Sequence, residues 1–403
     1  MGYLENFLEM WNESATTFPD LKIMFSNNEK TCKEKYLQQF FNDFKCENGP
    51  GKSCGDNMDQ NKLFASLKEL FREALGYSDR QLNIIFSDQM YESTCEFIIA
   101  ARKFDADLSI ESIFQASRNV WIMNGVQFLL DRKVALTPSI FAYSMLYPYT
   151  DNFIDDPLIS GVEKMEFSER FAQRLNNQKI AAKNLTEEKI FSLVAMIERE
   201  WDRELYPGVY KSLNGIHEAQ TRSMFLLTGN CDLTPERAME ICADKGGASV
   251  VADGFLINGV LNNSQEEFLY LYGAYLQLLD DLQDLGEDSG SGLMTCFAMA
   301  AKEGRIDKCV NKLFWLARKI IDVMSQCDFT DRQNFLSLID KSFFLFIAAS
   351  VLSNRDFVSN NYLARIEKYI PVNYDYAEKQ NKVMGNYKEV LIQKISEFAF
   401  NNQ

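Results

Sequence analysis

Apolar residues recur at three- and four-residue spacing along most of the chain, which is the pattern of helices with one buried face. Leu4, Phe7, Leu8 and Trp11 share such a face near the start. From Asp79 onward the same period is almost continuous, and no alternating β-branched run with hairpin turns stands out. The pattern predicts an all-α protein.

Proline and glycine mark the points where one predicted helix gives way to the next. The breaks fall at Thr137-Pro138, Asp156-Pro157, Tyr206-Pro207-Gly208, Thr234-Pro235, residues 286–292 and Ile370-Pro371. This spacing predicts roughly a dozen helices joined by short loops. Because no linker divides the middle of the chain, we expect one domain with one large core over residues 76–403. Residues 1–75 are expected to form a helical N-terminal extension packed on that core, with an exposed loop at 47–61.

The apolar run at 269–279 leads into a row of acidic residues. If the helix continues, Asp280, Asp284 and Asp288 lie four residues apart on one face. Stacked carboxylates repel one another unless a cation lies among them. Hard oxygen ligands suit Mg²⁺, whereas a solvated acidic helix end is the alternative for this row taken alone.

A second apolar helix ends in the same way, far upstream. Asp151 and Asp155 are one turn apart, Asp156 is adjacent, and Pro157 can end the helix directly after them. Two such helix ends predict carboxylates that face each other across the mouth of a bundle. Divalent ions between them would neutralise a bridging diphosphate.

Composition narrows the function further. The net charge of −15 argues against binding to nucleic acid or anionic membranes. The single histidine, His217, nearly excludes histidine-based zinc sites and Ser-His-Asp chemistry, and we interpret it as structural. The nine cysteines contain no Cys-x-x-Cys pair and predict reduced thiols, although Cys46 and Cys54 could pair in an oxidising compartment.

The start of the chain lacks the basic region and the long apolar core of a signal peptide. The longest apolar stretch, at 343–352, is expected to be too short to span a bilayer. A cytoplasmic protein without a transmembrane segment is therefore expected, with the oligomeric state open and a homodimer among the options.

These acidic regions resemble class I isoprenoid (terpenoid) synthases, and most closely the squalene/phytoene synthase branch. Asp151, Asp155 and Asp156 match the D-x-x-x-D-D type motif of that branch. Its second region, an aromatic-Leu-Gln followed by N-x-x-x-D-x-x-E-D, corresponds to Tyr275-Leu276-Gln277, Asp280, Asp284, Glu287 and Asp288. Asp280 replaces the usual Asn and keeps an oxygen ligand.

Other matches are shorter. Asp280, Asp281 and Asp284 also read as the D-D-x-x-D of trans-prenyl diphosphate synthases. Ser117-Arg118 resembles a Ser-Arg pair that binds diphosphate, and Lys245-Gly246-Gly247-Ala248 is similar to a Lys-Thr-Gly segment of those enzymes. The resemblance covers roughly residues 110–290.

The departures from these families are informative. Ala243 stands where squalene synthases carry a tyrosine, and Pro148 lies near the position of a basic residue that often precedes the first motif. Neither the Gly-Lys-x-x-Arg signature of chain-elongating enzymes nor an Arg-Arg pair after the first motif is visible. Squalene synthesis proper and routine chain elongation are both disfavoured.

The resemblance implies a single-domain helical bundle with a central active-site cavity and a Mg²⁺-dependent enzyme that ionises a prenyl diphosphate. The implied metal ligands are Asp151, Asp155, Asp156, Asp280, Asp281, Asp284, Glu287 and Asp288. The expected diphosphate contacts are Ser117, Arg118, Arg222 and Lys245, with Arg355 and Arg365 closing over the site. A surface role is the alternative for Arg222. Lys164, Arg170 and Arg174 are expected to form a solvated face. Two readings are open for Tyr143, Tyr149, Tyr275 and Asp253, which could point into the cavity: core packing is favoured for the tyrosines, and Asp253 is undecided.

Three functions remain open. The leading hypothesis is a class I terpene synthase, a lyase that converts the carbocation to a terpene and releases diphosphate. The alternative within the same chemistry is a prenyltransferase that joins the prenyl group to a second prenyl or an aromatic acceptor. The alternative of another class is a non-catalytic isoprenoid-binding or partner subunit. Substrate chain length and product skeleton stay open.

Overall fold

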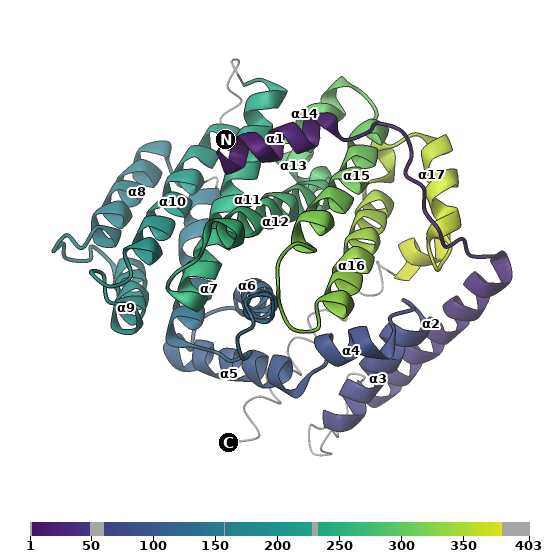
Figure 1. The fold of residues 1–403 in the computed structure, drawn as a ribbon, viewed down its shortest axis with the longest axis horizontal. Coiled ribbons are helices and arrows are strands. Elements are labelled where there is room, and N and C mark those ends of the chain that lie inside the picture. Colours follow the sequence, from purple (N-terminus) through teal and green to yellow (C-terminus); the bar gives the residue numbers. More distant parts are fainter. Residues whose placement is uncertain (1, 49–59, 157, 228–232, 381–403) are drawn as a thin grey trace.

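The computed structural model describes residues 2–48, 60–156, 158–227 and 233–380, without the side chains of residues 43–64 and 155. This part of the chain is all-helical, as predicted (Figure 1). The α-helices are α1 (Tyr3–Glu13), α2 (Asn27–Asn48), α3 (Gln60–Glu73), α4 (Asp79–Ile85), α5 (Asp88–Phe104), α6 (Ile110–Leu129), α7 (Pro138–Asp155), α8 (Gly161–Leu175), α9 (Leu185–Glu200), α10 (Pro207–Ser223), α11 (Pro235–Asn258), α12 (Asn263–Gln283), α13 (Leu285–Ser291), α14 (Cys296–Glu303), α15 (Asp307–Met324), α16 (Arg332–Ser353) and α17 (Asn360–Ile366). Short 3₁₀ helices are η1 (Met224–Leu227), η2 (Arg355–Phe357) and η3 (Glu367–Tyr369), and residues 374–380 are also helical.

The predicted helix starts at Pro138 and Pro235 are confirmed, and their caps explain them. Thr137 and Thr234 each accept a hydrogen bond from the backbone N–H three residues on, which satisfies one of the free donors of the first turn. Proline then occupies the first helical position, where its missing N–H costs nothing. The predicted end of α7 before Pro157 is also confirmed.

One predicted boundary is wrong. The glycines at 286–292 were expected to form a break, but residues 285–291 are helical and the break lies earlier, at Asp284. Asp284 ends α12 with φ −92° and ψ 7°, outside the helical range. Gly292 ends α13 in the left-handed conformation, with φ 81°. The acidic row is therefore divided between two helices that have different directions.

The apolar interior differs from the single large core that was predicted. One large cluster is built mainly from α4, α12 and α14–α17, and a second from α5–α10, with α6 and α11 contributing to both. A pocket separates them: Leu338 and Phe343 of the first cluster and Tyr143 and Leu213 of the second all line it. Figure 1 shows α11 and α12 at the centre of this arrangement, with α8–α10 to one side and α15 and α16 to the other.

The two central helices lie in backbone contact. A Cβ atom on Gly273 of α12 would lie 2.2 Å from the carbonyl oxygen of Gly246, and one on Gly246 of α11 would lie 2.4 Å from the carbonyl oxygen of Gly273. Carbon and oxygen do not approach so closely without covalent bonding, so only glycine fits at either position. This crossing sets the separation of the neighbouring residues on both helices.

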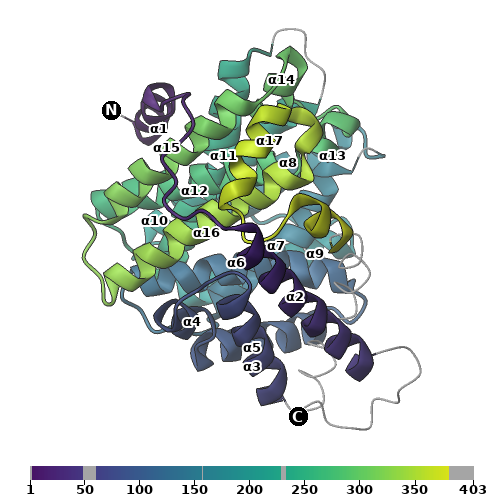
Figure 2. The same cartoon turned by 90° about the vertical axis from the view of Figure 1, so that its right-hand side faces the viewer.

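The first seventy-five residues divide between two places in the fold. Helix α1 packs on α11, α12 and α15, where Phe7 is fully buried and Asn6 donates to Glu267 at 2.7 Å. Helices α2 and α3 pack on each other, and α3 contacts α4 (Figure 2). Most of the predicted loop at 47–61, and the proposed pair of Cys46 and Cys54, lie outside the described residues and side chains.

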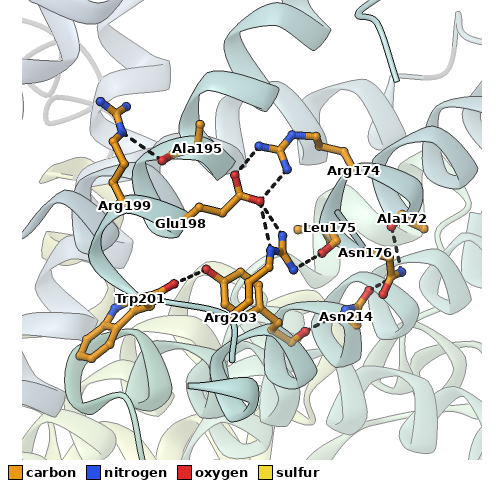
Figure 3. Close-up of polar contacts among 11 residues, drawn as sticks. Ala172, Arg174, Leu175, Asn176, Ala195, Glu198, Arg199, Trp201, Arg203 and Asn214 are labelled. Carbon is orange, nitrogen blue, oxygen red and sulfur yellow. Dashed lines mark hydrogen bonds and ion pairs between the residues drawn. The ribbon is translucent and has the colours of Figure 1, made fainter. Parts of the chain in front are cut away.

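The predicted solvated face of α8 is wrong. Arg170 forms a double hydrogen bond with the buried Glu187 of α9, and Lys164 is itself buried. Arg174 and Arg203 share the carboxylate of Glu198 (Figure 3). The basic residues of α8 thus hold α9 in place, because charge-assisted bidentate pairs fix orientation.

One described helix, α16, is long and apolar enough to cross a membrane by length and composition. The expectation that the longest apolar stretch is too short is wrong for this helix, because it extends well beyond 343–352. It nevertheless packs against α12 and α15, and it buries Phe335, Phe343 and Ile347 in the interior. The described helices therefore contain no clear transmembrane segment.

Candidate functional site

A pocket of about 1440 Å³ lies between the two apolar clusters. Its walls come from α3–α8, α10–α13 and α16 and are mainly aliphatic and aromatic. The lining reaches solvent at Arg118 and Asp280, whose side chains are 53% and 42% exposed, and also at Trp121 and Phe346. The volume exceeds the roughly 300–1,000 Å³ of ordinary ligand pockets.

Both predicted acidic regions contribute to this pocket. Asp151 lines it from α7, and Asp280, Asp284 and Glu287 line it from the end of α12 and the start of α13. Burial raises the pKa of Asp284, and the neighbouring carboxylate of Asp280 raises it further. Carboxylates offer hard oxygen donors, the kind of ligand that Mg²⁺ takes in proteins.

Other predicted ligands lie elsewhere. Asp156 caps the end of α7, where its carboxylate accepts from the N–H of Leu158 at 2.8 Å, and it is not among the pocket-lining residues. Asp281 and Asp288 are buried and also do not line the pocket. The side chain of Asp155 lies outside the described part of the chain.

Two of the predicted basic contacts reach the pocket. Arg118 lines it and donates to Asp280 at 3.0 Å, and Lys245 lines it from α11. Ser117 is buried beside Arg118, but its hydroxyl donates to the carbonyl of Ile113 in its own helix at 2.8 Å. The Ser-Arg pair therefore brings one cationic group to the pocket.

The structure does not bring the remaining three arginines to the pocket lining. Arg222 pairs with Asp244 of α11. Arg355 pairs with Glu378 at 2.9 Å, and Arg365 stacks over the ring of Phe18 at 3.9 Å. Each has a local partner, and none is among the residues that line the pocket.

A polar row lies deeper in the wall, on the same helix faces as the charged residues. Tyr147 and Tyr143 precede Asp151 by one and two turns, about 6 and 12 Å along α7. Ser249 follows Lys245 by one turn of α11 and forms a 2.7 Å hydrogen bond with Tyr147. The sequence offered Tyr143 as a cavity residue only as the less favoured reading, and it did not single out Tyr147 or Ser249, although their four-residue spacing from Asp151 and Lys245 was visible.

Further pocket residues were also missed. His217, interpreted as structural, lines the pocket from α10 and forms a 3.3 Å hydrogen bond with Ser168. Burial lowers the pKa of His217, which favours the neutral form of the ring. Gln220, one turn away, lines the pocket too, and its buried amide nitrogen has no hydrogen-bond partner among the described residues. The remaining predicted tyrosines pack as expected: Tyr149 donates to Asp105, and Tyr275 donates to the carbonyl of Leu313.

Asp253 lies one turn beyond Ser249 and is fully buried. Asn119 donates weakly to its Oδ1 at 3.5 Å, and its Oδ2 has no hydrogen-bond partner within the described part of the chain. Burial raises the pKa of Asp253 well above its usual value. The carboxyl is therefore protonated over a wider pH range in the folded protein than in the unfolded chain.

This shift gives a stability prediction for Asp253→Asn. A carboxyl whose pKa is raised in the folded state contributes stability that is complete below its unfolded pKa of about 3.9, and that is lost as the pH rises towards the folded pKa. Asparagine does not titrate, so we expect the melting temperature of the variant to exceed that of wild type by a few degrees at about pH 8 and by much less at about pH 5. Differential scanning fluorimetry across this range measures the difference. A difference that stays constant with pH would contradict the assignment.

Fold and site together define an all-helical protein with a large, mainly apolar pocket whose lining includes carboxylate and basic groups. In comparisons with protein-family models and with curated proteins, the chain matches none.

Proposed function

We propose that this protein is a Mg²⁺-dependent class I terpene synthase, which ionises a prenyl diphosphate and releases diphosphate. The observation that carries the proposal is the pocket itself: carboxylates from α7 and from α12–α13 line it together with Arg118 and Lys245. The rest of the lining is mainly aliphatic and aromatic. A substrate with an anionic head and a hydrocarbon tail matches both regions.

The charged residues of the pocket would bind the head group. Asp151, Asp280, Asp284 and Glu287 would hold Mg²⁺, with Asp155 as a further predicted ligand, and the ion supplies charge neutralisation of the leaving diphosphate. Arg118 presents a planar, permanently charged donor for phosphate oxygens, and Lys245 presents a compact point charge. Arg118 is paired with Asp280 at 3.0 Å, so binding of the head group requires Arg118 to exchange that partner for a phosphate oxygen.

The walls of the pocket would enclose the hydrocarbon tail of the substrate. Apolar side chains exclude the water that would capture a carbocation. The rings of Tyr143, Tyr147 and Tyr272 line the pocket, and aromatic faces attract positive charge. The Tyr147–Ser249 hydroxyl pair adds two polar groups to a mainly apolar wall.

A prenyltransferase is the second candidate, and the size of the pocket favours it. The lining extends from the carboxylates to Phe71 of α3, Ile84 of α4 and Leu338 of α16, and the volume exceeds that of ordinary ligand pockets. That space could take a second substrate beside the prenyl chain.

The test is incubation of the purified full-length protein with geranyl, farnesyl and geranylgeranyl diphosphates, with and without Mg²⁺. We expect Mg²⁺-dependent diphosphate release and a terpene, detected by gas chromatography and mass spectrometry, from one substrate alone. A product that requires a second prenyl or aromatic substrate would support the transferase. Binding of prenyl diphosphates without diphosphate release in any combination would contradict both and support a non-catalytic isoprenoid-binding protein.

A further inference from the structure

A second group of metal-type ligands lies behind the acidic side of the pocket. Cys242 of α11, Asp281 of α12 and Cys296 of α14 each offer one ligand atom, and these atoms all lie within 4.8 Å of one another. The three residues expose only 2%, 4% and 9% of their surface. Three separate helices therefore converge on one buried point.

The carboxylate of Asp281 is held with a defined orientation. The side-chain amide of Gln277, one turn earlier on α12, donates to Oδ1 at 2.9 Å. The other oxygen, Oδ2, lies 3.6 Å from the sulfur of Cys296. One oxygen is thus fixed by an amide, and the other faces the thiols.

A second buried acid lies close to this group. Asp288 accepts a hydrogen bond from the hydroxyl of Thr295, the residue directly before Cys296, at 3.1 Å. Burial, together with the nearby carboxylate of Asp281, raises the pKa of Asp288 to about 7. Buried carboxyl groups are costly unless they are paired or coordinate a metal, so two of them beside two buried thiols require an explanation.

We propose that Cys242, Asp281 and Cys296 bind a Zn²⁺ ion that joins α11, α12 and α14. Two thiolates and one carboxylate form a donor set that Zn²⁺ accepts at about 2.0–2.3 Å, in tetrahedral geometry. Mg²⁺ takes oxygen ligands, so this site differs in kind from the carboxylates of the pocket. Binding displaces the protons of the two thiols to solvent.

The wild-type protein provides the first test. Full-length protein purified in reducing buffer and dialysed against a weak chelator is expected to retain about one zinc per chain by mass spectrometry of the elements. Replacement of the bound zinc by Co²⁺ should produce the thiolate-to-cobalt absorption band in the near ultraviolet. A folded protein with neither zinc nor that absorption would overturn the proposal, as would a Cys242–Cys296 disulfide found in the native protein.

Substitutions of the proposed ligands test where the zinc ion binds. Cys242→Ser and Cys296→Ser should each abolish the cobalt–thiolate absorption, whereas Cys327→Ser, far from the group in sequence and outside it, should retain the absorption in full. Gln277→Leu leaves all three ligands in place and should lower zinc affinity about 10–100-fold, because it removes the amide that orients Asp281. Metal that stays bound in both Cys242→Ser and Cys296→Ser would contradict the assignment.

One variant separates this proposal from the proposed function. Asp284→Asn changes a pocket carboxylate and leaves the buried group intact, so it should retain its zinc whatever happens to turnover. Loss of zinc in Asp284→Asn would show that the ion lies in the pocket and not behind it.

Discussion

Asp151→Asn and Asp284→Asn are each expected to lower the rate of the proposed diphosphate release by at least about 10²–10³-fold, which is the usual cost of removing one group that stabilises developing charge. Asparagine preserves the shape and one oxygen but removes the negative charge with which each side chain would bind Mg²⁺. The two residues lie on α7 and at the α12–α13 junction, so similar losses would tie both acidic regions to one function. The measurement is phosphate-coupled release of diphosphate at saturating Mg²⁺ and prenyl substrate.

Asp156→Asn is the matched control. Asp156 belongs to the same acidic motif as Asp151, yet it caps α7 and does not line the pocket, so this variant should retain most of the activity.

The melting temperature of Asp284→Asn separates an effect on folding from an effect on catalysis. Asp280 and burial both raise the pKa of Asp284, so the removal of that charge should leave the melting temperature equal or higher. Full turnover in Asp151→Asn or Asp284→Asn would end the proposed assignment of the metal ligands.

Gly273→Ala is expected to destabilise the fold by on the order of 1–3 kcal/mol or more, as overpacking does in close-packed interiors. The added methyl would lie 2.2 Å from the carbonyl oxygen of Gly246 and 2.8 Å from the Cβ of Val250. Backbone atoms cannot rotate away as a side chain can, so α11 and α12 must move apart. Chemical denaturation followed by circular dichroism measures the loss.

Gly215→Ala is its control. Gly215 also lies within a helix, α10, but a Cβ there meets no atom within 4 Å. Alanine is favoured over glycine inside a helix by roughly 0.5–1 kcal/mol, so this variant should gain stability. Equal effects of the two substitutions would mean that helix propensity, and not the crossing of α11 and α12, decides the outcome.

The all-helical class was predictable because apolar periodicity and proline caps are local properties. The helix starts at Pro138 and Pro235 required only the residues beside them. Each acidic helix end was recognisable in the same way, from residues within a few turns of it. That Asp151 and Asp284 line one pocket followed from the hypothesis that the two acidic ends share a cation, and the structure places both in its lining.

The orientation of individual carboxylates was not predictable. Four-residue spacing places Asp280, Asp284 and Asp288 on one face only if the helix is continuous. The backbone of Asp284 leaves the helical conformation, so Asp288 faces Thr295 and not the pocket. No residue type in this segment forces that change, because the junction depends on how α13 packs on α14.

Long-range pairing explains the other differences. The guanidinium of Arg222 is a group that commonly binds phosphate, but it pairs with Asp244, twenty-two residues later. Arg174 is similar: its partner Glu198 belongs to the next helix. A sequence shows which side chains carry charge, whereas the partner of each charge is decided by the packing of whole helices.

The glycine crossing also limits how the pocket can diversify. Lys245 adjoins Gly246 in α11, and Asp280 lies two turns beyond Gly273 in α12, so main-chain contact holds the basic and acidic sides of the mouth at one spacing. The opposite wall is formed by side chains such as Phe71, Ile84 and Leu338, which substitution can enlarge or reduce without moving a helix backbone. For a terpene synthase as proposed above, substitutions in this wall would change the space for the hydrocarbon and leave the charged residues of the pocket in place.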